Sequence, residues 1–363
     1  MRKCKTVLAL SMVFLILSSV IAFAADTDYK NFTIDPAKIS KDKLGTTVYL
    51  AVSIRGLENP YIATINEGMK LFAKYLDTIG QKYEMQVLDS GGSNDKEVDN
   101  MRQFAAKAGG NAIAYSDPNE NAIAFPLAEA MAESGGFIGT AWNKPDDVGP
   151  ADLTPNWVIH TSPDNILNGY NIAVELFKFM GGKGKIFVVE GMLGNTAAIA
   201  RAQGLEKALA EYPDIEVANR DTGNWNTSEG LTLVETWLNT TPDVGGVWCA
   251  NDNMATGALQ ALDKVGKKGV VGVVGVDANT DIVEAVRDGY AIATVSSNGY
   301  LQGGYTLAIC YAAWTGLIDV ESLPPEYREF ATPALLITKA NAAEYLTDTP
   351  TFDFSKPFAC KAD

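Results

Sequence analysis

Short apolar segments alternate with longer amphipathic ones along most of this chain. The short segments are rich in β-branched and aromatic residues, which favour strands, and they span 48–54, 85–88, 112–115, 137–140, 157–160, 185–189, 215–218, 247–250, 270–276, 291–296 and 334–337. The longer segments repeat apolar residues with the period of a helix, over 61–76, 96–107, 165–180, 197–210 and 254–265. Strands and helices in this order form βαβ units. We therefore predict an α/β fold of doubly wound parallel sheets with helices on both faces.

The composition fits a globular chain of about two domains. Of the 363 residues, 47% are hydrophobic and 20% are charged, which is close to the average of folded proteins. The net charge is −15, from 29 Lys and Arg against 44 Asp and Glu. Because so acidic a surface repels the phosphate backbone, we expect no nucleic-acid partner.

The first residues have the pattern of an export signal. Arg2, Lys3 and Lys5 precede an apolar run over 7–23, and the run ends in an Ala-Phe-Ala site at Ala24. This pattern predicts a signal peptide over 1–24 that is cleaved in an exported, periplasmic or otherwise extracytoplasmic protein, and a retained membrane anchor is the alternative. The acidic, polar stretch that follows, up to residue 45, is expected to be a loosely packed extension.

Histidine and cysteine are too scarce for several kinds of site. His160 is the single histidine, which argues against His-dependent catalysis and against any site with two imidazoles. No Cys-x-x-Cys pair occurs, so we expect no metal and no cofactor. Cys249 lies in a predicted buried strand and should be an inert thiol. Cys310 and Cys360 could pair, and the sequence leaves this open.

Polar and aromatic residues collect where the predicted strands end. In parallel sheets, ligands bind at the carboxyl ends of the strands. The residues at these ends are mostly amides, hydroxyls and indoles: Ser53, Asn59, Tyr61, Ser116, Trp142, Asn143, Asn195, Trp225, Asn251, Asp277, Ser297 and Asn298. Amides and hydroxyls match the hydroxyl groups of a neutral polyhydroxylated ligand, and aromatic rings cover its apolar faces. Phosphate would require Lys, Arg or glycine-rich backbone instead.

Several motifs in a fixed order resemble a known family. They are Val52-Ser53, Asn59-Pro60-Tyr61, Val87-Leu88-Asp89-Ser90, Asp164-Asn165, Asn251-Asp252-Asn253-Met254-Ala255-Thr256-Gly257-Ala258-Leu259 and Val274-Gly275-Val276-Asp277. Together they resemble the periplasmic sugar-binding proteins of the ribose-binding type, which have the type I fold, over about residues 47–340. The resemblance implies two similar α/β lobes joined by a three-strand hinge. The lobes of such proteins close over a sugar and deliver it to an ABC importer.

The resemblance also implies a domain organisation. After the signal peptide and the extension over 25–45, the N-terminal lobe is expected over 46–161 plus 298–329. The C-terminal lobe is expected over 162–297 plus 330–346, and a tail over 347–363. The implied crossings between the lobes lie near Thr161, Ser297 and Phe330. The implied partners are a small neutral carbohydrate or polyol and the membrane subunits of an ABC transporter, and the protein is expected to be a monomer.

The resemblance assigns ligand contacts residue by residue. Asn59, Tyr61, Ser53 and Ser116 match positions of the first lobe, and Trp225, Asn251 and Asp277 match positions of the second. The chain departs from the ribose-binding pattern at Trp142-Asn143, where that pattern has Asp-Arg. It departs again at Ile199, where a ligand arginine is expected, although a shift of two residues would place Arg201 there. Ser297, beside Asn298, replaces a glutamine.

These departures argue for a ligand other than ribose. Without the two arginines the site would lose two bidentate hydrogen-bond donors, and the extra indole of Trp142 would suit a deoxy sugar, a polyol or a small linear molecule.

Two other functions stay open at this point. The chain could be a sensor that docks on a chemoreceptor or histidine kinase, which would need the same cleft. It could also be an exported carbohydrate hydrolase that uses paired carboxylates such as Asp89 and Asp277. Other conspicuous residues are interpreted as structural, namely Asp252 in its loop, His160 at a hinge, and Trp157, Trp237, Trp248 and Trp314 in the core.

Overall fold

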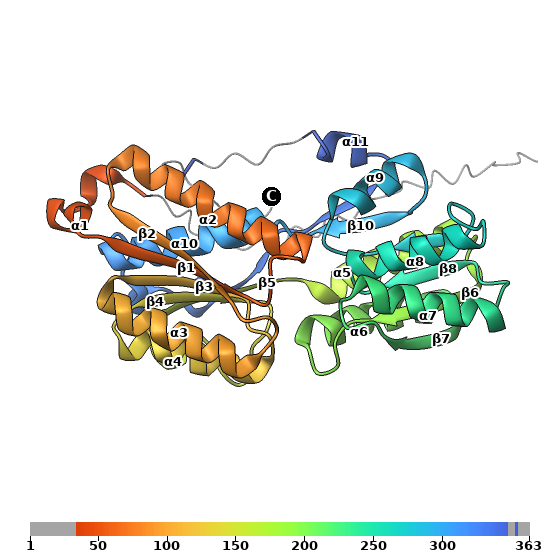
Figure 1. Ribbon diagram of the computed structural model, residues 1–363, viewed down its shortest axis with the longest axis horizontal. Coiled ribbons are helices and arrows are strands. Elements are labelled where there is room, and N and C mark those ends of the chain that lie inside the picture. Colours follow the sequence, from red (N-terminus) through yellow and green to blue (C-terminus); the bar gives the residue numbers. More distant parts are fainter. Residues whose placement is uncertain (1–33, 348–352, 355–363) are drawn as a thin grey trace, which may run out of the picture.

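The computed structural model describes residues 34–347 and 353–354, which form two lobes side by side (Figure 1). The first lobe contains a six-stranded sheet of order β11-β5-β4-β3-β1-β2. Its strands are β1 (Val48–Ile54), β2 (Tyr83–Asp89), β3 (Ala112–Ser116), β4 (Phe137–Ala141), β5 (Trp157–Pro163) and β11 (Glu329–Thr332). All its pairings are parallel.

The second lobe repeats this plan. Its six-stranded sheet has the order β12-β10-β9-β8-β6-β7. The strands are β6 (Lys183–Glu190), β7 (Asp214–Thr222), β8 (Gly246–Cys249), β9 (Gly272–Val274), β10 (Ala293–Ser296) and β12 (Leu335–Thr338). The pairings are parallel except that β12 runs antiparallel to β10. The predicted fold class, two doubly wound α/β lobes, is confirmed.

Helices cover both faces of each sheet. In the first lobe, α2 (Pro60–Ile79) and α10 (Gly299–Thr315) lie on one face and α3 (Asn94–Ala108) and α4 (Ala124–Glu133) on the other (Figure 1). Each face buries its own apolar cluster. In the second lobe, α5 (Asn165–Phe179) contacts α6 (Thr196–Glu211), and α7 (Thr227–Thr240) contacts α8 (Asp252–Lys264). The remaining α-helices of the described residues are α1 (Lys41–Gly45), α9 (Thr280–Asp288) and α11 (Ala342–Tyr345), and short 3-10 helices occur in several connections.

The chain crosses between the lobes where β5 leads to α5, where β10 leads to α10, and where β11 leads to β12. Two of these crossings differ slightly from the prediction. β5 and β11 pair with each other as far as Pro163 and Thr332, so both strands stay in the first sheet a few residues beyond Thr161 and Phe330. The sequence did not indicate these extensions, because the added residues are mostly polar or proline and are held in the sheet by the pairing of β5 with β11.

Part of the predicted extension is more firmly packed than expected. Ile34 is fully buried and Ile39 nearly so. The Ile34 amide donates to the carbonyl oxygen of Phe354 at 3.0 Å, and the Phe354 side chain is fully buried beside Phe72. The prediction of a loosely packed extension is therefore wrong at Ile34 and Ile39, which anchor a stretch whose other described residues are largely exposed. The predicted signal peptide lies outside the described residues.

The two described cysteines are buried and unbonded. Cys249 and Cys310 are both free and fully buried, and burial raises the pKa of each thiol. The prediction of an inert thiol at Cys249 is confirmed. Cys360 lies outside the described residues, so its pairing stays untested.

Helices α2 and α10 touch through glycine, which gives a first test of the packing. A Cβ atom on Gly303 would overlap the carbonyl oxygen of Ile65. Gly303→Ala is therefore expected to lower the free energy of unfolding by about 1–3 kcal/mol, the usual cost of overpacking. Chemical denaturation measures this, with Gly45→Ala as control, because open space surrounds Gly45. Equal stability of the two variants would contradict the close helix contact.

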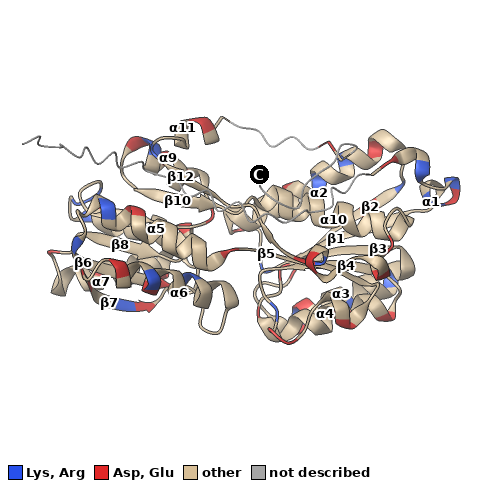
Figure 2. Cartoon of the chain, turned by 180° about the vertical axis from the view of Figure 1, so that it is seen from behind, with Lys and Arg blue, Asp and Glu red and all other residues tan. Residues whose placement is uncertain are grey.

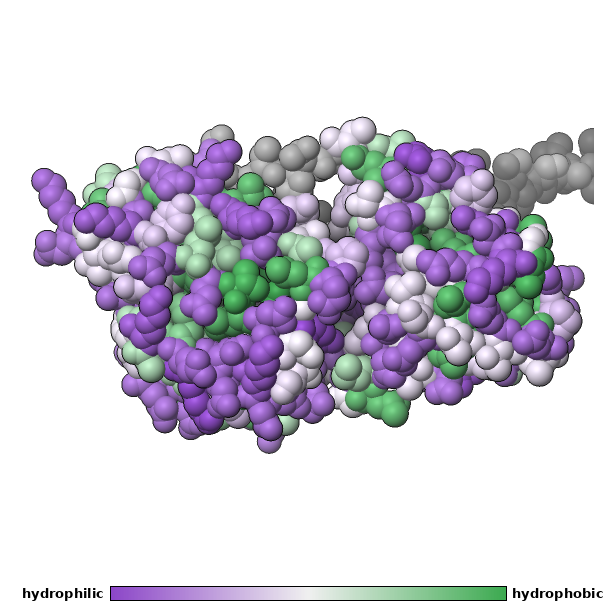
Figure 3. All heavy atoms as spheres, viewed as in Figure 1, coloured by the Kyte–Doolittle hydropathy of each residue, from purple (hydrophilic) through white to green (hydrophobic). Residues whose placement is uncertain are grey.

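The surface is charged and hydrophilic over both lobes. Acidic and basic residues are interspersed on the two lobes (Figure 2), and hydrophilic residues dominate the view in Figure 3. Within residues 34–347 and 353–354, no helix has the length and apolarity needed to cross a bilayer. The same residues contain no group of three or more His, Cys, Asp or Glu that could hold a metal ion.

Candidate functional site

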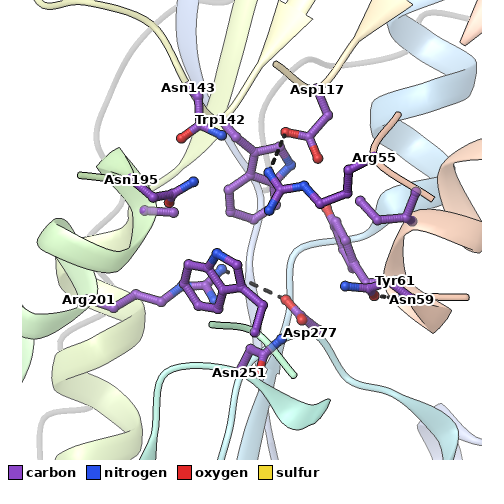
Figure 4. Close-up of a pocket in the computed structure, with 13 residues that line it drawn as sticks. Arg55, Asn59, Tyr61, Asp117, Trp142, Asn143, Asn195, Arg201, Asn251 and Asp277 are labelled. Carbon is purple, nitrogen blue, oxygen red and sulfur yellow. Dashed lines mark hydrogen bonds and ion pairs between the residues drawn. The ribbon is translucent and has the colours of Figure 1, made fainter. Parts of the chain in front are cut away.

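An open pocket, called the cavity below, lies between the two lobes (Figure 4). Its walls come from segments that follow strands, because the carboxyl ends of both sheets face the same cleft. Arg55 and Asp117 follow β1 and β3 in the first lobe, and Asn251 and Asp277 follow β8 and β9 in the second. The full lining is Arg55, Asn59, Tyr61, Ile62, Asp117, Trp142, Asn143, Asn195, Ala197, Arg201, Trp225, Asn251 and Asp277.

Most residues selected from the sequence line this one cavity. The structure brings together Asn59, Tyr61, Trp142, Asn143, Asn195, Arg201, Trp225, Asn251 and Asp277. It places Ser53, Ser116, Ser297 and Asn298 elsewhere.

Ser53 and Ser116 bind a buried carboxylate instead of facing the cavity. Both hydroxyls donate to Oε1 of Glu97, at 3.0 and 3.2 Å, and the Asn119 amide donates to Oε2 at 3.0 Å. Burial raises the pKa of Glu97 to about 7, although these hydrogen bonds oppose the shift. The sequence prediction for the two serines is therefore corrected: they stabilise a carboxyl group below the sheet ends.

Ser297 and Asn298 act at the second crossing between the lobes. Ser297 is fully buried and is not part of the cavity lining. Asn298 has a left-handed backbone, with φ of 50°, and its side chain accepts from the Leu301 amide at 3.1 Å, so it caps α10. Neither residue lines the cavity, so the prediction that they contact a ligand there is corrected: Asn298 caps α10, and Ser297 is buried at the crossing.

Arg201, and not Ile199, faces the cavity. Ile199 is 50% exposed on α6, whereas Arg201 is 3% exposed. The guanidinium donates from Nε to Asn165 Oδ1 at 3.0 Å and from Nη1 to the Ala250 carbonyl at 2.6 Å. The expectation that Ile199 occupies the arginine position is wrong, and the predicted discrimination against ribose loses its basis. Two residues along a helix turn the side chain by more than half a turn, so a small alignment shift decides the outcome.

Each lobe contributes one arginine and one aspartate to the cavity. Nη2 of Arg55 lies 3.9 Å from Asp117 Oδ1 in the first lobe, and Nη2 of Arg201 lies 3.8 Å from Asp277 Oδ1 in the second. Burial raises the pKa of Asp117 to about 6 and that of Asp277 to about 7, and the neighbouring arginines limit both shifts. When the carboxylates are ionised, the two ion pairs balance the charge of each half of the site.

Aromatic rings from both lobes surround Arg201. Its Cζ lies 5.4 Å from the Trp142 ring centroid and 5.5 Å from that of Trp225, distances at which a cation is attracted to an aromatic face. Trp142 belongs to the first lobe, so this contact joins the lobes across the cavity (Figure 4). Tyr61 contacts Trp142 edge-on, with ring centroids 5.5 Å apart.

Asparagines that line the cavity also cap helices. The side-chain oxygens of Asn59, Asn195 and Asn251 accept from backbone amides at the starts of α2, α6 and α8. These caps stabilise the helix starts and consume the amide oxygens. The amide nitrogens of Asn59 and Asn195 can be offered to a ligand as donors, whereas the Asn251 side chain also hydrogen-bonds Asp277.

The backbone is strained at several cavity residues. Positive φ angles occur at Trp142 (66°), Trp225 (61°) and Asp277 (127°). Non-glycine residues rarely adopt this conformation, which costs about 1–3 kcal/mol each and concentrates at functional sites. These strained residues all line the cavity, which supports a functional interpretation.

Four buried polar atoms of the lining have no hydrogen-bond partner among the described residues. Two are donors, Arg55 Nε and Trp225 Nε1, and two are acceptors, Asp117 Oδ1 and Asn143 Oδ1. A buried polar atom without a partner costs about 1–3 kcal/mol. The cavity therefore suits a molecule that both donates and accepts hydrogen bonds.

The sequence prediction omitted four residues of the lining: the charged Arg55 and Asp117, and the apolar Ile62 and Ala197. For Arg55 and Asp117 a signal was present. Each directly follows or nearly follows a predicted strand, the same signal that selected their neighbours. A single charged residue at the end of a strand is more often solvated than part of a site. The sequence does not show that Arg55 and Asp117 pair with each other, so neither was selected.

The structural interpretations of the other conspicuous residues are confirmed where the structure describes them. Asp252 is fully buried and accepts from the Asn279 amide and the Thr294 hydroxyl. His160 lies on β5, and its Nδ1 is hydrogen-bonded to Thr140 Oγ1 of β4 at 2.8 Å. Burial lowers the pKa of His160 to about 3. The four tryptophans interpreted as core residues, Trp157, Trp237, Trp248 and Trp314, are buried.

The raised pKa values predict a pH dependence of stability. Asp117 and Asp277 have pKa values of about 6 and 7 in the folded protein, above the ordinary value of 3.8. The folded state therefore binds more protons than the unfolded state between these values, and both groups make stability fall as the pH rises from about 4 to 7. Denaturation at pH 5 and pH 7.5 should show a smaller difference for Asp277→Asn than for the wild type. An unchanged difference would contradict the burial of this carboxyl group.

Comparisons with known proteins agree with this geometry. A family profile described as "Periplasmic binding protein domain" matches residues 50–317. The xylitol-binding protein of Mycolicibacterium smegmatis is 36% identical over 189 residues, which is 52% of this chain and 52% of that protein. The match therefore spans about half the length of that relative.

Two further matches cover more of the chain. The ribose import binding protein of Escherichia coli is 30% identical over 73% of this chain and 82% of its own length. The crystal structure of a twin-arginine translocation pathway signal protein from Burkholderia phytofirmans superimposes with a TM-score of 0.79 and 35% identity, over 83% of this chain and 92% of the other.

Proposed function

We propose that this chain, which belongs to the type I periplasmic sugar-binding proteins, captures one small neutral sugar or polyol between its lobes. The lobes would close over the ligand and the protein, as a monomer, would deliver it to the membrane subunits of an ABC importer outside the cytoplasm. The relatives are binding proteins, so no catalytic step is part of the proposal.

The mixture of unpaired donors and acceptors in the cavity carries this proposal. Arg55 Nε and Trp225 Nε1 can only donate, and Asp117 Oδ1, when ionised, can only accept. A hydroxyl group donates and accepts at once, so vicinal hydroxyls can satisfy neighbouring atoms of both kinds. The indoles of Trp142 and Trp225 would cover the C–H surface of the same molecule.

The balanced charges support a neutral ligand. Each arginine of the cavity has an aspartate within 4 Å. An anionic ligand would meet Asp117 and Asp277 as well as the arginines, and burying its charge beside a like charge is unfavourable. The ion pairs thus hold hydrogen-bond donors and acceptors in place while the charges within each pair cancel.

The relatives support the same ligand class. Xylitol is an open-chain polyol and ribose a pentose, and the relatives that these names describe match this chain in sequence. The alternative of a hydrolase built on Asp89 and Asp277 lacks support, because Asp89 is exposed, accepts from the Gly91 amide and is absent from the cavity lining.

A thermal-shift screen tests the proposal. The panel should contain xylitol, ribose, myo-inositol and other neutral compounds, with the matching sugar acids and sugar phosphates as controls. A ligand at about one hundred times its dissociation constant should add about 2.7 kcal/mol of stability. Stabilisation by neutral compounds alone is expected. Stabilisation by the anionic compounds alone would contradict the assignment.

A further inference from the structure

A buried glutamine behind the cavity binds two of its aromatic residues. Gln302 lies on α10 and is 2% exposed. Its Oε1 accepts from the Tyr61 hydroxyl at 2.8 Å and from the Trp142 indole nitrogen at 2.9 Å. Gln302 itself is not part of the cavity lining.

These hydrogen bonds decide what the aromatic residues can offer a ligand. The indole N–H is a donor only, so the contact with Trp142 also fixes which end of the Gln302 amide is the oxygen. With its indole N–H bound to Gln302, Trp142 presents only carbon surface to the cavity, and Tyr61 has its hydroxyl proton committed to the same oxygen. Trp225 differs, because its indole nitrogen has no partner among the described residues.

The other end of the same amide lies at the hinge. Gln302 lines a second cavity together with Thr161 of β5 and Thr332 of β11, and these strands lead into two of the three crossings. Gln302 Nε2 and both threonine Oγ1 atoms are buried without a hydrogen-bond partner among residues 34–347 and 353–354. Gln302 therefore lies between the aromatic wall of the ligand cavity and the hinge strands.

We propose that Gln302 is a positioning residue of the ligand site: its amide oxygen holds Tyr61 and Trp142 so that they form an apolar wall for the C–H face of the ligand. This inference rests on the proposed function for its ligand, but the hydrogen bonds that carry it exist without one. Loss of the acceptor would remove the shared partner of the Tyr61 hydroxyl, the Trp142 indole N–H and, at 3.5 Å, the Tyr115 hydroxyl, and would loosen the Trp142 ring.

The test uses Gln302→Met, which keeps the length of the side chain and removes the acceptor. Gln81→Met is a matched control, because Gln81 is also buried in the first lobe and its Oε1 accepts from the Tyr311 hydroxyl at 2.8 Å. Gln302→Glu keeps an acceptor oxygen at the same place. The first measurement is the Trp142 indole N–H resonance in protein with ¹⁵N-labelled tryptophan, assigned with the Trp142→Phe variant. The second is the affinity for the neutral compound that stabilises the wild type best in the screen.

In Gln302→Met, the Trp142 indole resonance should shift and its exchange with solvent should rise at least tenfold, with about a tenfold loss of affinity. Gln81→Met should leave the resonance and the affinity unchanged, and Gln302→Glu should keep the resonance near its wild-type position. An unchanged resonance in Gln302→Met, or the same changes in Gln81→Met, would overturn the inference. The resonance is measured without ligand, so a failure of the proposed function would show separately, as a screen with no neutral binder.

Discussion

Arg201→Met should abolish ligand binding in practice, with a loss of affinity of about one hundredfold or more. Arg201 bonds Asn165 and the Ala250 carbonyl and lies beside Asp277, so its loss leaves a buried carboxylate without its cation. Removing one partner of a buried charge pair costs about 2–5 kcal/mol in affinity, and the substitution also removes the hydrogen bonds of Arg201 to Asn165 and Ala250. The same loss should destabilise the unliganded protein by about 3–5 kcal/mol at neutral pH.

The pH gives this prediction a second readout. Without Arg201, the charged form of Asp277 loses its main stabilising neighbour, so the variant should recover stability as the pH falls and the carboxyl group is protonated. Calorimetric titration and denaturation at two pH values measure both effects. Ile199→Ala on the same helix is the control, because Ile199 is half exposed, and its affinity should stay within about twofold. Equal losses of affinity in the two variants would favour the alternative alignment, in which Ile199 occupies the arginine position.

Trp225→Ala should weaken binding by at least about thirtyfold, or about 2 kcal/mol. Trp225 combines a ring at the cavity with an unpaired indole N–H. The substitution removes the apolar cover of the ligand and also admits water, which weakens neighbouring hydrogen bonds.

Trp225→Phe separates the two contributions of this side chain. Phenylalanine keeps an aromatic face and lacks the donor, so it should lose about fivefold, the value of one hydrogen bond near 1 kcal/mol. Isothermal titration of both variants measures the difference. Near-wild-type affinity in Trp225→Ala would place the ligand elsewhere. Trp225 is partly exposed on a loop, so neither variant should unfold the lobe.

The fold was predictable because its signals are local and repeated. Alternating strands and helices imply parallel sheets, and β1 has the bounds that its apolar run predicted. The strand β11 was missed, because its sequence Glu-Phe-Ala-Thr is short and partly exposed at a sheet edge. Such a strand is stabilised by its pairing with β5 and carries little pattern of its own.

The site was predictable only in part. The end of a strand places a residue near the cleft, but the sequence does not say in which direction its side chain points. Ser53 and Ser116 lie at the ends of β1 and β3, and Arg55 and Asp117 follow these strands directly. The serines nevertheless bind Glu97 and do not face the cavity. Successive residues of a strand point to opposite faces, so one position decides between cavity and core for Ser116 and Asp117, whereas Arg55 lies beyond the end of β1. Glu97 itself lies on α3, far from any strand end in sequence.

Gln302 shows the opposite kind of signal. It is a polar residue within α10, most of whose residues are buried, and a lone buried amide must find partners. The sequence could have indicated that Gln302 is special. Only the fold shows that its partners are Tyr61, from the start of α2, and Trp142, from the end of β4.

A crystal structure with the neutral compound that stabilises the protein best would test the central claim most directly. The account predicts one molecule between the lobes, with its C–H face against Trp142 and its hydroxyls on Arg55, Asp117, Asn143 and Trp225, the groups whose buried atoms have no partner in the described chain. Density for that compound outside this cavity, or inside it with contacts to one lobe alone, would contradict the account.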